Sequence, residues 1–210
     1  AEAIAIITKK ASERLARFAF NYARKNNRKK VTIIHKANVL KATMGLFRST
    51  AFEVSKGFAD IAVDERVVVN MAQQLVIAPE KYDILLTTNL FGDILSDLAA
   101  GLIGGLGLSP GANIGDKYAL FEPVHGSAPK YADYKVSIVN PIAMIESACM
   151  MLDFIEENAI AQKIRKAVAE VVAEGNVRTY DMMKMTGRQD VIDKGAASTQ
   201  QMADAIIAKL

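Results

Sequence analysis

The sequence predicts an α/β fold, and two observations support this prediction. Short apolar runs rich in β-branched residues, such as Val31–Ile34 and Tyr82–Thr88, alternate with segments that repeat apolar residues at helical spacing. The 210 residues are 51% hydrophobic and 23% charged, which is typical of globular proteins, and the chain is long enough for one large domain or two smaller ones.

The chain is expected to begin with a strand at Ala3–Ile7, followed by a helix that Thr8 caps. The apolar face of this helix is expected to consist of four residues at helical spacing: Leu15, Phe18, Ala19 and Tyr22. The basic cluster at Lys25–Lys30 closes the helix and leads into a buried strand at Val31–Ile34.

Two helices are then expected, at Thr50–Lys56 and at Val69–Ile77, and Pro79 stops the second of them. A short strand within Tyr82–Thr88 follows. It precedes a helix that begins near Gly92 and runs into a glycine-rich stretch.

This glycine-rich stretch, at residues 101–115, is the best candidate for a domain boundary, which we place between residues 1–103 and 104–210. Its glycines do not form a Rossmann fingerprint. They follow a helix instead of a strand, and no acidic residue stands where the ribose contact belongs. The sequence therefore does not predict a Rossmann fold.

After the boundary, a strand is expected at Tyr118–Phe121, and Asn140 is expected to cap a helix whose first residue is Pro141. The apolar stripe of that helix is Ile142, Ile145, Cys149 and Leu152. A last helix begins near Ser198, with the stripe Ala203, Ile206, Ile207 and Leu210. The clustered methionines are expected to be packing residues: Met182, Met183 and Met185.

Charge and cysteine content exclude several classes of protein. The net charge of +3 is too small and too dispersed for a nucleic-acid-binding protein, although it suits a site for anionic substrates. The single cysteine, Cys149, excludes an internal disulfide framework, and no apolar run approaches the length of a membrane span. We therefore expect a cytoplasmic protein that binds neither nucleic acid nor membrane.

Asp93 and Asp97 are the first candidate site. They are four residues apart, so both carboxylates lie on one face of the helix that follows a strand. Carboxylate oxygens suit Mg²⁺ or Mn²⁺. The same pair taken alone also fits a solvated acidic face that complements the helix dipole.

Lys36 is the second candidate, because it directly follows a buried strand in the segment His35–Asn38. A lysine at a strand end that faces a cleft can serve as an acid–base group. The alternative is a surface lysine in a loop.

The loop Glu122–Tyr131 is the third candidate. Its small residues let backbone amides approach a ligand, and Lys130 adds a positive charge beside the ring of Tyr131. This combination suits a nucleotide phosphate and base, although short Gly/Ser/Pro runs are also common in surface turns.

Taken together and in this order, these segments resemble the family of isocitrate and isopropylmalate dehydrogenases over nearly the whole chain. The resemblance is carried by six segments: residues 13–20, HKAN at 35–38, Gln74–Val76, NLFGDILSD at 89–97, PGANIG at 110–115 and EPVHGSAP at 122–129. It implies the two-domain α/β fold of that family. Residues 1–103 would form the small domain with the dimerisation, metal and lysine sites, and residues 104–210 the C-terminal part of the large cofactor-binding domain.

The resemblance also implies roles for the candidate residues. Asp93 and Asp97 would bind Mg²⁺ or Mn²⁺ together with the hydroxyl and carboxylate of the substrate, and Asp93 would take part in catalysis. Lys36 would be the catalytic lysine, and Asn38 would lie near the nicotinamide. In this family the lysine and asparagine serve the neighbouring subunit, which implies a homodimer with shared active sites.

The implied cofactor is NADP. Members that use NAD usually carry an acidic residue after HGSAP, whereas this chain has Lys130 and Tyr131. Tyr180 and Lys184 resemble the residues that bind the 2′-phosphate, with Lys184 in place of the usual Arg. The remaining residues implied at the cofactor are those of the loop and of the adenosine contacts: His125, Gly126, Ser127, Ala128 and Asn140.

Three departures from the family pattern bear on the function. Val69 stands where a third metal-linked Asp is usual, and Thr43-Met44-Gly45 replaces the frequent Thr-Asp-Gly. The first part of a typical family chain, with its substrate arginines and catalytic tyrosine, lies outside the 210 residues. We therefore expect NADP-dependent oxidative decarboxylation of isocitrate to 2-oxoglutarate. The alternatives are a catalytically silent subunit or fragment that binds nucleotide or a partner, and a homoisocitrate or isopropylmalate dehydrogenase.

Overall fold

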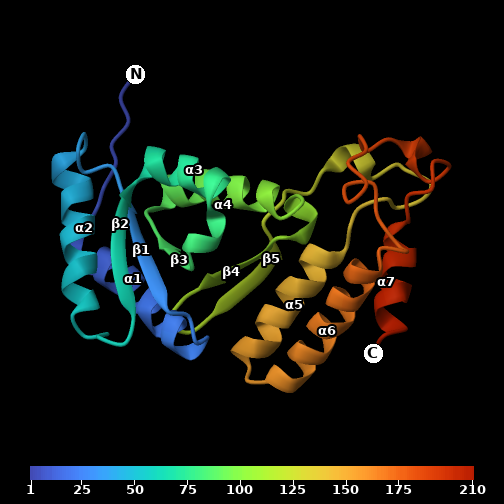
Figure 1. Cartoon of the computed structure of the whole chain (residues 1–210). Helices are drawn as coiled ribbons and strands as arrows, with labels where there is room; N and C mark the ends of the chain where they lie inside the picture. Colours follow the sequence, from blue (N-terminus) through green and yellow to red (C-terminus); the bar gives the residue numbers. More distant parts are fainter. The chain divides into compact units, whose positions relative to one another are not determined.

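Three parallel strands form the centre of the first part of the chain, as Figure 1 shows. β1 (Lys30–His35) lies between β2 (Ala62–Val67) and β3 (Ile84–Leu86) and pairs with both of them. The computed structural model describes residues 1–210, which divide into a first unit, Ala1–Ala99, and a second unit, Ala100–Leu210.

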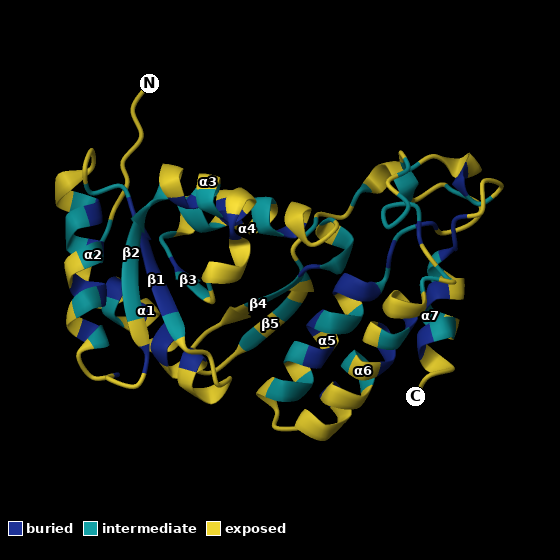
Figure 2. Ribbon diagram, viewed as in Figure 1, coloured by how far each residue is buried: buried dark blue, intermediate teal, exposed yellow.

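Helices cover both faces of this sheet. They are α1 (Lys9–Lys25), α2 (Lys41–Ser55), α3 (Val68–Ile77) and α4 (Asn89–Leu102). Val31 and Ile33 of β1 pack against α1 and α2, whereas Ile34 packs against Met71 of α3 and Leu95 of α4. Because side chains alternate along a strand, this two-sided packing buries Val31–His35, and β1 is the buried centre of the unit in Figure 2.

Helix α1 begins as predicted but buries a different face. The Thr8 hydroxyl accepts a hydrogen bond from the Ala11 amide at 3.2 Å, which caps the helix. The predicted apolar face was wrong for Leu15, Phe18 and Tyr22, which are 39%, 44% and 43% exposed. The buried face consists of Ser12, Ala16, Ala19, Phe20 and Ala23. Its mostly small side chains let the helix approach the sheet and α2 closely.

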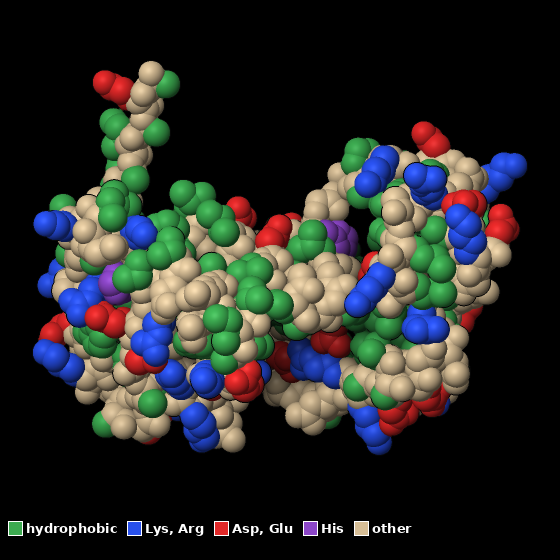
Figure 3. Space-filling model, turned by 45° about the horizontal axis from the view of Figure 1, so that its top comes forward, with side chains coloured by type: hydrophobic (Ala, Val, Ile, Leu, Met, Phe, Trp, Pro, Cys, Tyr) green, Lys and Arg blue, Asp and Glu red, His purple; other side chains and the backbone are tan.

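The strand expected at Ala3–Ile7 is absent, because no other strand of the structure pairs with this segment. Ile4 and Ile6 are 86% and 78% exposed. In Figure 3 the segment projects from the surface with its hydrophobic side chains uncovered.

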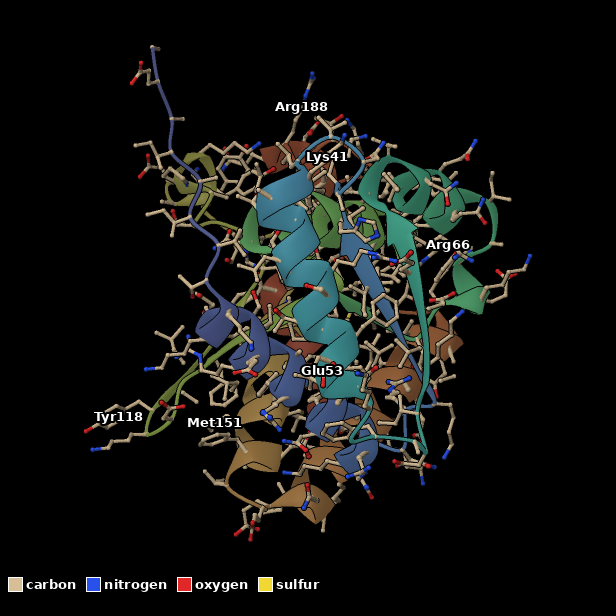
Figure 4. All side chains as sticks on the ribbon, turned by 90° about the vertical axis from the view of Figure 1, so that its left-hand side faces the viewer. Lys41, Glu53, Arg66, Tyr118, Met151 and Arg188 are labelled. Carbon is tan, nitrogen blue, oxygen red and sulfur yellow. The ribbon has the colours of Figure 1, made fainter.

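Other element boundaries in the first unit also differ from the prediction. Helix α2 begins at Lys41, nine residues before the expected Thr50, and Figure 4 shows Lys41 and Glu53 near its two ends. Strand β2 was not predicted, because three of its six residues are charged. Helix α4 begins at Asn89 and runs through Gly92 instead of starting there.

The second unit combines a hairpin with three helices. Strands β4 (Pro110–Ile114) and β5 (Ala119–Pro123) pair antiparallel, and Figure 4 shows Tyr118 exposed at their turn. The helices are α5 (Ile142–Phe154), α6 (Asn158–Glu174) and α7 (Thr199–Ile207). Helix α5 packs on the hairpin and on α6, and α7 packs on α6.

Two apolar clusters stabilise this unit. Met182 joins the one between α5, α6 and α7, while Met183 and Met185 pack with Tyr131 and Tyr180 in the other. The predicted packing role of these methionines is therefore confirmed.

The helices of the second unit agree only in part with the prediction. In α5, Ile142 and Cys149 are buried as predicted. In α7, Ile206 is buried as predicted and Met202 is buried too, whereas Ile207 and Leu210 of the predicted stripe are 62% and 46% exposed. Helix α6 was not predicted. None of the seven α-helices combines the length and the apolar character that crossing a bilayer requires.

The packing of α1 predicts that two phenylalanines of this helix differ sharply in their effect on stability. Phe20→Ala should lower the free energy of unfolding by about 3–5 kcal/mol, because Phe20 is fully buried and leaves a cavity. Phe18→Ala, two residues away and 44% exposed, should change it by less than about 1 kcal/mol. Urea denaturation of both variants measures the difference, and equal losses would contradict the assignment of the buried face.

Candidate active site

The candidate catalytic and metal-binding segments all follow strands of the parallel sheet. Lys36 follows β1, Val69 lies at the start of α3 after β2, and Asp93 lies on α4 after β3. Since the strands are parallel and His35 is level with Val67, their carboxyl ends share one edge of the sheet. Ligand sites of open α/β sheets usually lie at this edge.

Asp93 and Asp97 are exposed on α4, and neither carboxylate has a hydrogen-bond or ion-pair partner in the chain. Because α4 begins at Asn89, Asp93 lies beyond its first turn. The dipole contribution expected for a first-turn carboxylate therefore does not explain this pair.

Asp93 and Asp97 fit a divalent cation that takes only a few of its ligands from the protein. No group of three or more Asp, Glu, His or Cys residues is arranged so that it could hold a metal ion, and Val69 is a 60% exposed apolar side chain. Mg²⁺ often takes only one or two protein carboxylates and completes its shell with water and substrate oxygens. Asp93 and Asp97 can therefore hold such an ion only together with ligands from outside this unit.

A hydrogen-bonded turn carries Lys36 and Asn38. Nδ1 of the buried His35 accepts a hydrogen bond from the Ala37 amide at 3.1 Å. Lys36 itself is half-buried and Asn38 is exposed. Burial lowers the pKa of His35, and nearby Arg48 lowers it further, while the Glu65 carboxylate opposes this shift.

A pocket of about 500 Å³ lies in the second unit, within the range usual for small-molecule sites. It is lined by Leu106, Gly107, His125, Gly126, Ala128, Lys130, Tyr131, Val139, Asn140, Tyr180 and Asp181. Seven of the residues predicted to bind the cofactor are among them. The structure thus brings together the loop after β5 and the segment after α6.

Two tyrosines and a lysine form one wall of this pocket. The ammonium nitrogen of Lys130 lies 4.8 Å from the centre of the Tyr131 ring. The hydroxyl of Tyr180 donates to that of Tyr131 at 3.4 Å. Burial raises the pKa of Tyr180, and the hydrogen bond with Tyr131 adds to the shift, so the Tyr180 phenol remains neutral near pH 7.

The backbone of the loop is held in an unusual conformation. Ala128 has a φ of +45°, in the left-handed region that residues other than glycine rarely occupy. Pro129 follows directly and starts a short 3₁₀ turn that carries Lys130 and Tyr131. Such conformations persist where the surrounding structure fixes them, often at ligand sites.

A buried polar cluster around Asn140 also borders the pocket. The Asn140 side chain accepts from the Ile142 amide at 3.0 Å and donates to Asp181 at 3.0 Å. The other oxygen of Asp181 accepts from the hydroxyl of the fully buried Thr179 at 2.5 Å. Asn140 was predicted to be the N-cap of a helix that begins at Pro141, but Pro141 is itself the N-cap of α5, which begins at Ile142. The Asn140 side chain still accepts from the first amide of that helix.

Three predicted cofactor residues do not line the pocket, and one of them, Asn38, lies in the first unit. Ser127 and Lys184 are exposed, and Lys184 occupies a left-handed position with a φ of +56°. Conversely, the sequence interpretation missed Gly107 and Asp181. A Cβ on Gly107 would lie 2.9 Å from a carboxylate oxygen of Asp181, so only glycine permits this close approach.

Gly187 should tolerate no side chain, because a Cβ there would lie 2.3 Å from the Tyr131 hydroxyl and 2.9 Å from the Tyr180 ring. We expect Gly187→Ala to lower the free energy of unfolding by about 1–3 kcal/mol through overpacking. Gly126→Ala is the control, since nothing lies within 4 Å of its Cβ position. Thermal unfolding of both variants measures the effect, and equal stability would show that the tyrosine pair is loosely packed.

The sequence of this chain matches a known protein family and several individual proteins. The pattern of the isocitrate/isopropylmalate dehydrogenase family matches residues 1–206. The chain is 49% identical over 206 residues to an isocitrate/homoisocitrate dehydrogenase of Thermus thermophilus, which covers 98% of this chain and 58% of that protein. It is 41% identical over 211 residues to NAD isocitrate dehydrogenase regulatory subunit 2 of Arabidopsis thaliana, covering 100% of this chain and 54% of that protein.

A solved structure of isocitrate dehydrogenase from Methylococcus capsulatus is also similar, with a TM-score of 0.89 and 51% identity over 99% of this chain and 58% of that one. The chain thus spans little more than half of the length of these relatives. The predicted family and its α/β fold are confirmed. With its sequence matched almost from end to end and its fold shared with a solved dehydrogenase, this chain belongs to the isocitrate/isopropylmalate dehydrogenase family.

Proposed function

We propose that this chain contributes to an enzyme that oxidises isocitrate with NADP and a divalent cation and releases 2-oxoglutarate and CO₂. The observation that carries the proposal is the wall of the pocket at which Lys130, Tyr131 and Tyr180 meet. A cation and two tyrosine hydroxyl groups favour a ligand with a phosphate at that position.

The pocket supports NADP over NAD through its charges. An NAD site needs an acceptor for the ribose hydroxyls, and Lys130 stands at the loop position where the NAD-dependent pattern has an acidic residue. Asp181 is the one carboxylate that lines the pocket. One of its oxygens accepts a hydrogen bond from Asn140, and the other accepts one from Thr179. In this proposal His125 and Asn140 flank the adenosine, the backbone of 126–128 approaches the cofactor, and Lys184 assists from its exposed turn.

The sheet edge of the first unit would supply the groups for the chemistry. Asp93 and Asp97 would hold the cation against the hydroxyl and carboxylate of the substrate, and the ion when bound would act as a Lewis acid on the substrate oxygen. Lys36 would take the hydroxyl proton as hydride leaves C2 for the nicotinamide, and Asn38 would orient the nicotinamide. We further propose a homodimer in which Lys36 and Asn38 serve the partner's site, with residues 1–103 as the small domain and 104–210 as part of the cofactor domain.

A silent or regulatory subunit is the second candidate, and Val69 is the observation that favours it. An exposed valine stands where the family pattern has a carboxylate, which leaves two carboxylates for the cation. One of the relatives is itself named a regulatory subunit. Homoisocitrate and isopropylmalate are the alternative substrates, because the substrate arginines of the family pattern lie outside the residues of this chain.

The direct test is formation of NADPH from isocitrate with Mg²⁺ or Mn²⁺, run beside NAD⁺, homoisocitrate and isopropylmalate. Turnover that is selective for NADP and isocitrate is the expected result. Turnover with another pair would reassign cofactor or substrate. A folded sample that binds nucleotide without turnover would favour the silent subunit.

Lys130→Asp should lower kcat/KM for NADP about 100-fold, because it replaces an attractive charge at the 2′-phosphate by a repulsive one. The value for NAD should change less than about threefold. Lys135→Asp is the matched control, an exposed lysine five residues later that does not line the pocket. Equal losses for NADP and NAD would contradict the assignment, and a comparable loss in Lys184→Asp would show that the phosphate reaches that turn.

Val69→Asp should tighten Mg²⁺ or Mn²⁺ binding at least about tenfold, because it restores a third carboxylate at the sheet edge. Val76→Asp is the matched control, since Val76 lies two turns further along α3 and is likewise 60% exposed. Isothermal titration with Mn²⁺ in the presence of substrate measures the affinity. An unchanged affinity in Val69→Asp would mean that position 69 does not face the cation.

A further inference from the structure

A buried imidazole links the end of β1 to the turn that carries Lys36. His35 is the last residue of β1, and only 6% of its surface is exposed. Its Nδ1 accepts the hydrogen bond of the Ala37 amide at 3.1 Å, across Lys36. The Lys36 carbonyl in turn accepts from the amides of Val39 and Leu40 at 3.0 and 2.8 Å, which leads the chain into α2.

Two other elements hold this ring from its far side. Its Nε2 lies 3.4 Å from a carboxylate oxygen of Glu65 on β2. Arg48 of α2 donates to both oxygens of the same carboxylate, from Nε and, at 2.9 Å, from Nη2. The imidazole thus sits between the central strand, an edge strand and a helix.

The ring keeps a polar atom buried at a cost in stability. Nε2 is shielded from solvent and makes no hydrogen bond of normal geometry. An apolar side chain of similar size would fill this space without that cost. The one group for which His35 provides a well-formed partner is the Ala37 amide, and this amide lies between Lys36 and Asn38.

We propose that His35 is a positioning residue, whose Nδ1 fixes the turn at Ala37 and thereby the direction of the Lys36 and Asn38 side chains. Nδ1 must keep a lone pair to accept this hydrogen bond, so the proton of the neutral ring resides on Nε2 and faces Glu65. The inference rests on the proposed catalytic role of Lys36, and it adds to that role the residue that sets the geometry.

The experiment replaces His35 in the active enzyme by two residues of different hydrogen-bonding ability. His35→Leu fills the space but offers no acceptor. His35→Asn can accept from the amide two residues ahead, as asparagine does in Asx-turns, and so should rescue the turn. The readouts are hydrogen exchange at the Ala37 amide, and kcat and KM for the substrate.

In His35→Leu we expect exchange at Ala37 to be at least about ten times faster and kcat at least about ten times lower, with KM within about threefold of the wild type. In His35→Asn both quantities should stay within about threefold of the wild type. Unchanged exchange in His35→Leu would overturn the proposal. So would a loss of kcat in His35→Asn as large as that in His35→Leu with Ala37 still protected.

Lys36→Met in the same series separates this inference from the proposed function. If Lys36→Met turns over like the wild type, the catalytic role of Lys36 is wrong, and with it the inference. If Lys36→Met is inactive while His35→Leu retains full kcat, the proposed function stands and His35 has no positioning role.

Discussion

The parallel pairing of β1 with both of its neighbours is the constraint on which the first unit depends. Parallel strands cannot be joined by tight turns, so each connection needs a helix, and those helices cover the two faces of the sheet. The register then brings the three carboxyl ends to one edge, where the chain leaves each strand with a different polar segment. This topology brings the candidate catalytic and metal-binding residues to one edge, although they are far apart in the sequence.

The pocket of the second unit is formed in a different way, because its residues are not gathered at the edge of a parallel sheet. Its walls come from a loop and an irregular segment that are held by side-chain contacts. The phenols of Tyr131 and Tyr180 meet across 49 residues of sequence, and Asn140 reaches Asp181 across 41. These contacts need space next to the backbone, and Gly107 and Gly187 supply it. The shape of the pocket therefore depends as much on missing side chains as on present ones.

Sequence reasoning succeeded where one local rule decided the structure. It found β1 because an apolar run at a sheet centre can be buried on both faces, and it found the cap at Thr8 because the hydroxyl oxygen there meets an unpaired amide. It missed β2 because the charges of that strand find partners on other elements, such as Arg48 for Glu65, which no local pattern shows. The face of α1 was misjudged since two adjacent stripes share the helical period, and packing against the sheet selects the one with small residues.

The pocket after β5 also depends on long-range contacts that no local sequence pattern shows. The conformation of its loop affects the entropy of ligand binding. Lys130, Tyr131 and Tyr180 were recognised through a family resemblance, whereas the importance of Asp181 and Gly107 follows from their close approach to each other and to Asn140. The loop beside them turns at Ala128, where an alanine adopts a conformation that glycine reaches more easily. An alanine in this position samples fewer shapes than a glycine. The loss of conformational entropy that orders this loop therefore occurs when the chain folds, and a ligand that arrives later binds to a surface that is already ordered.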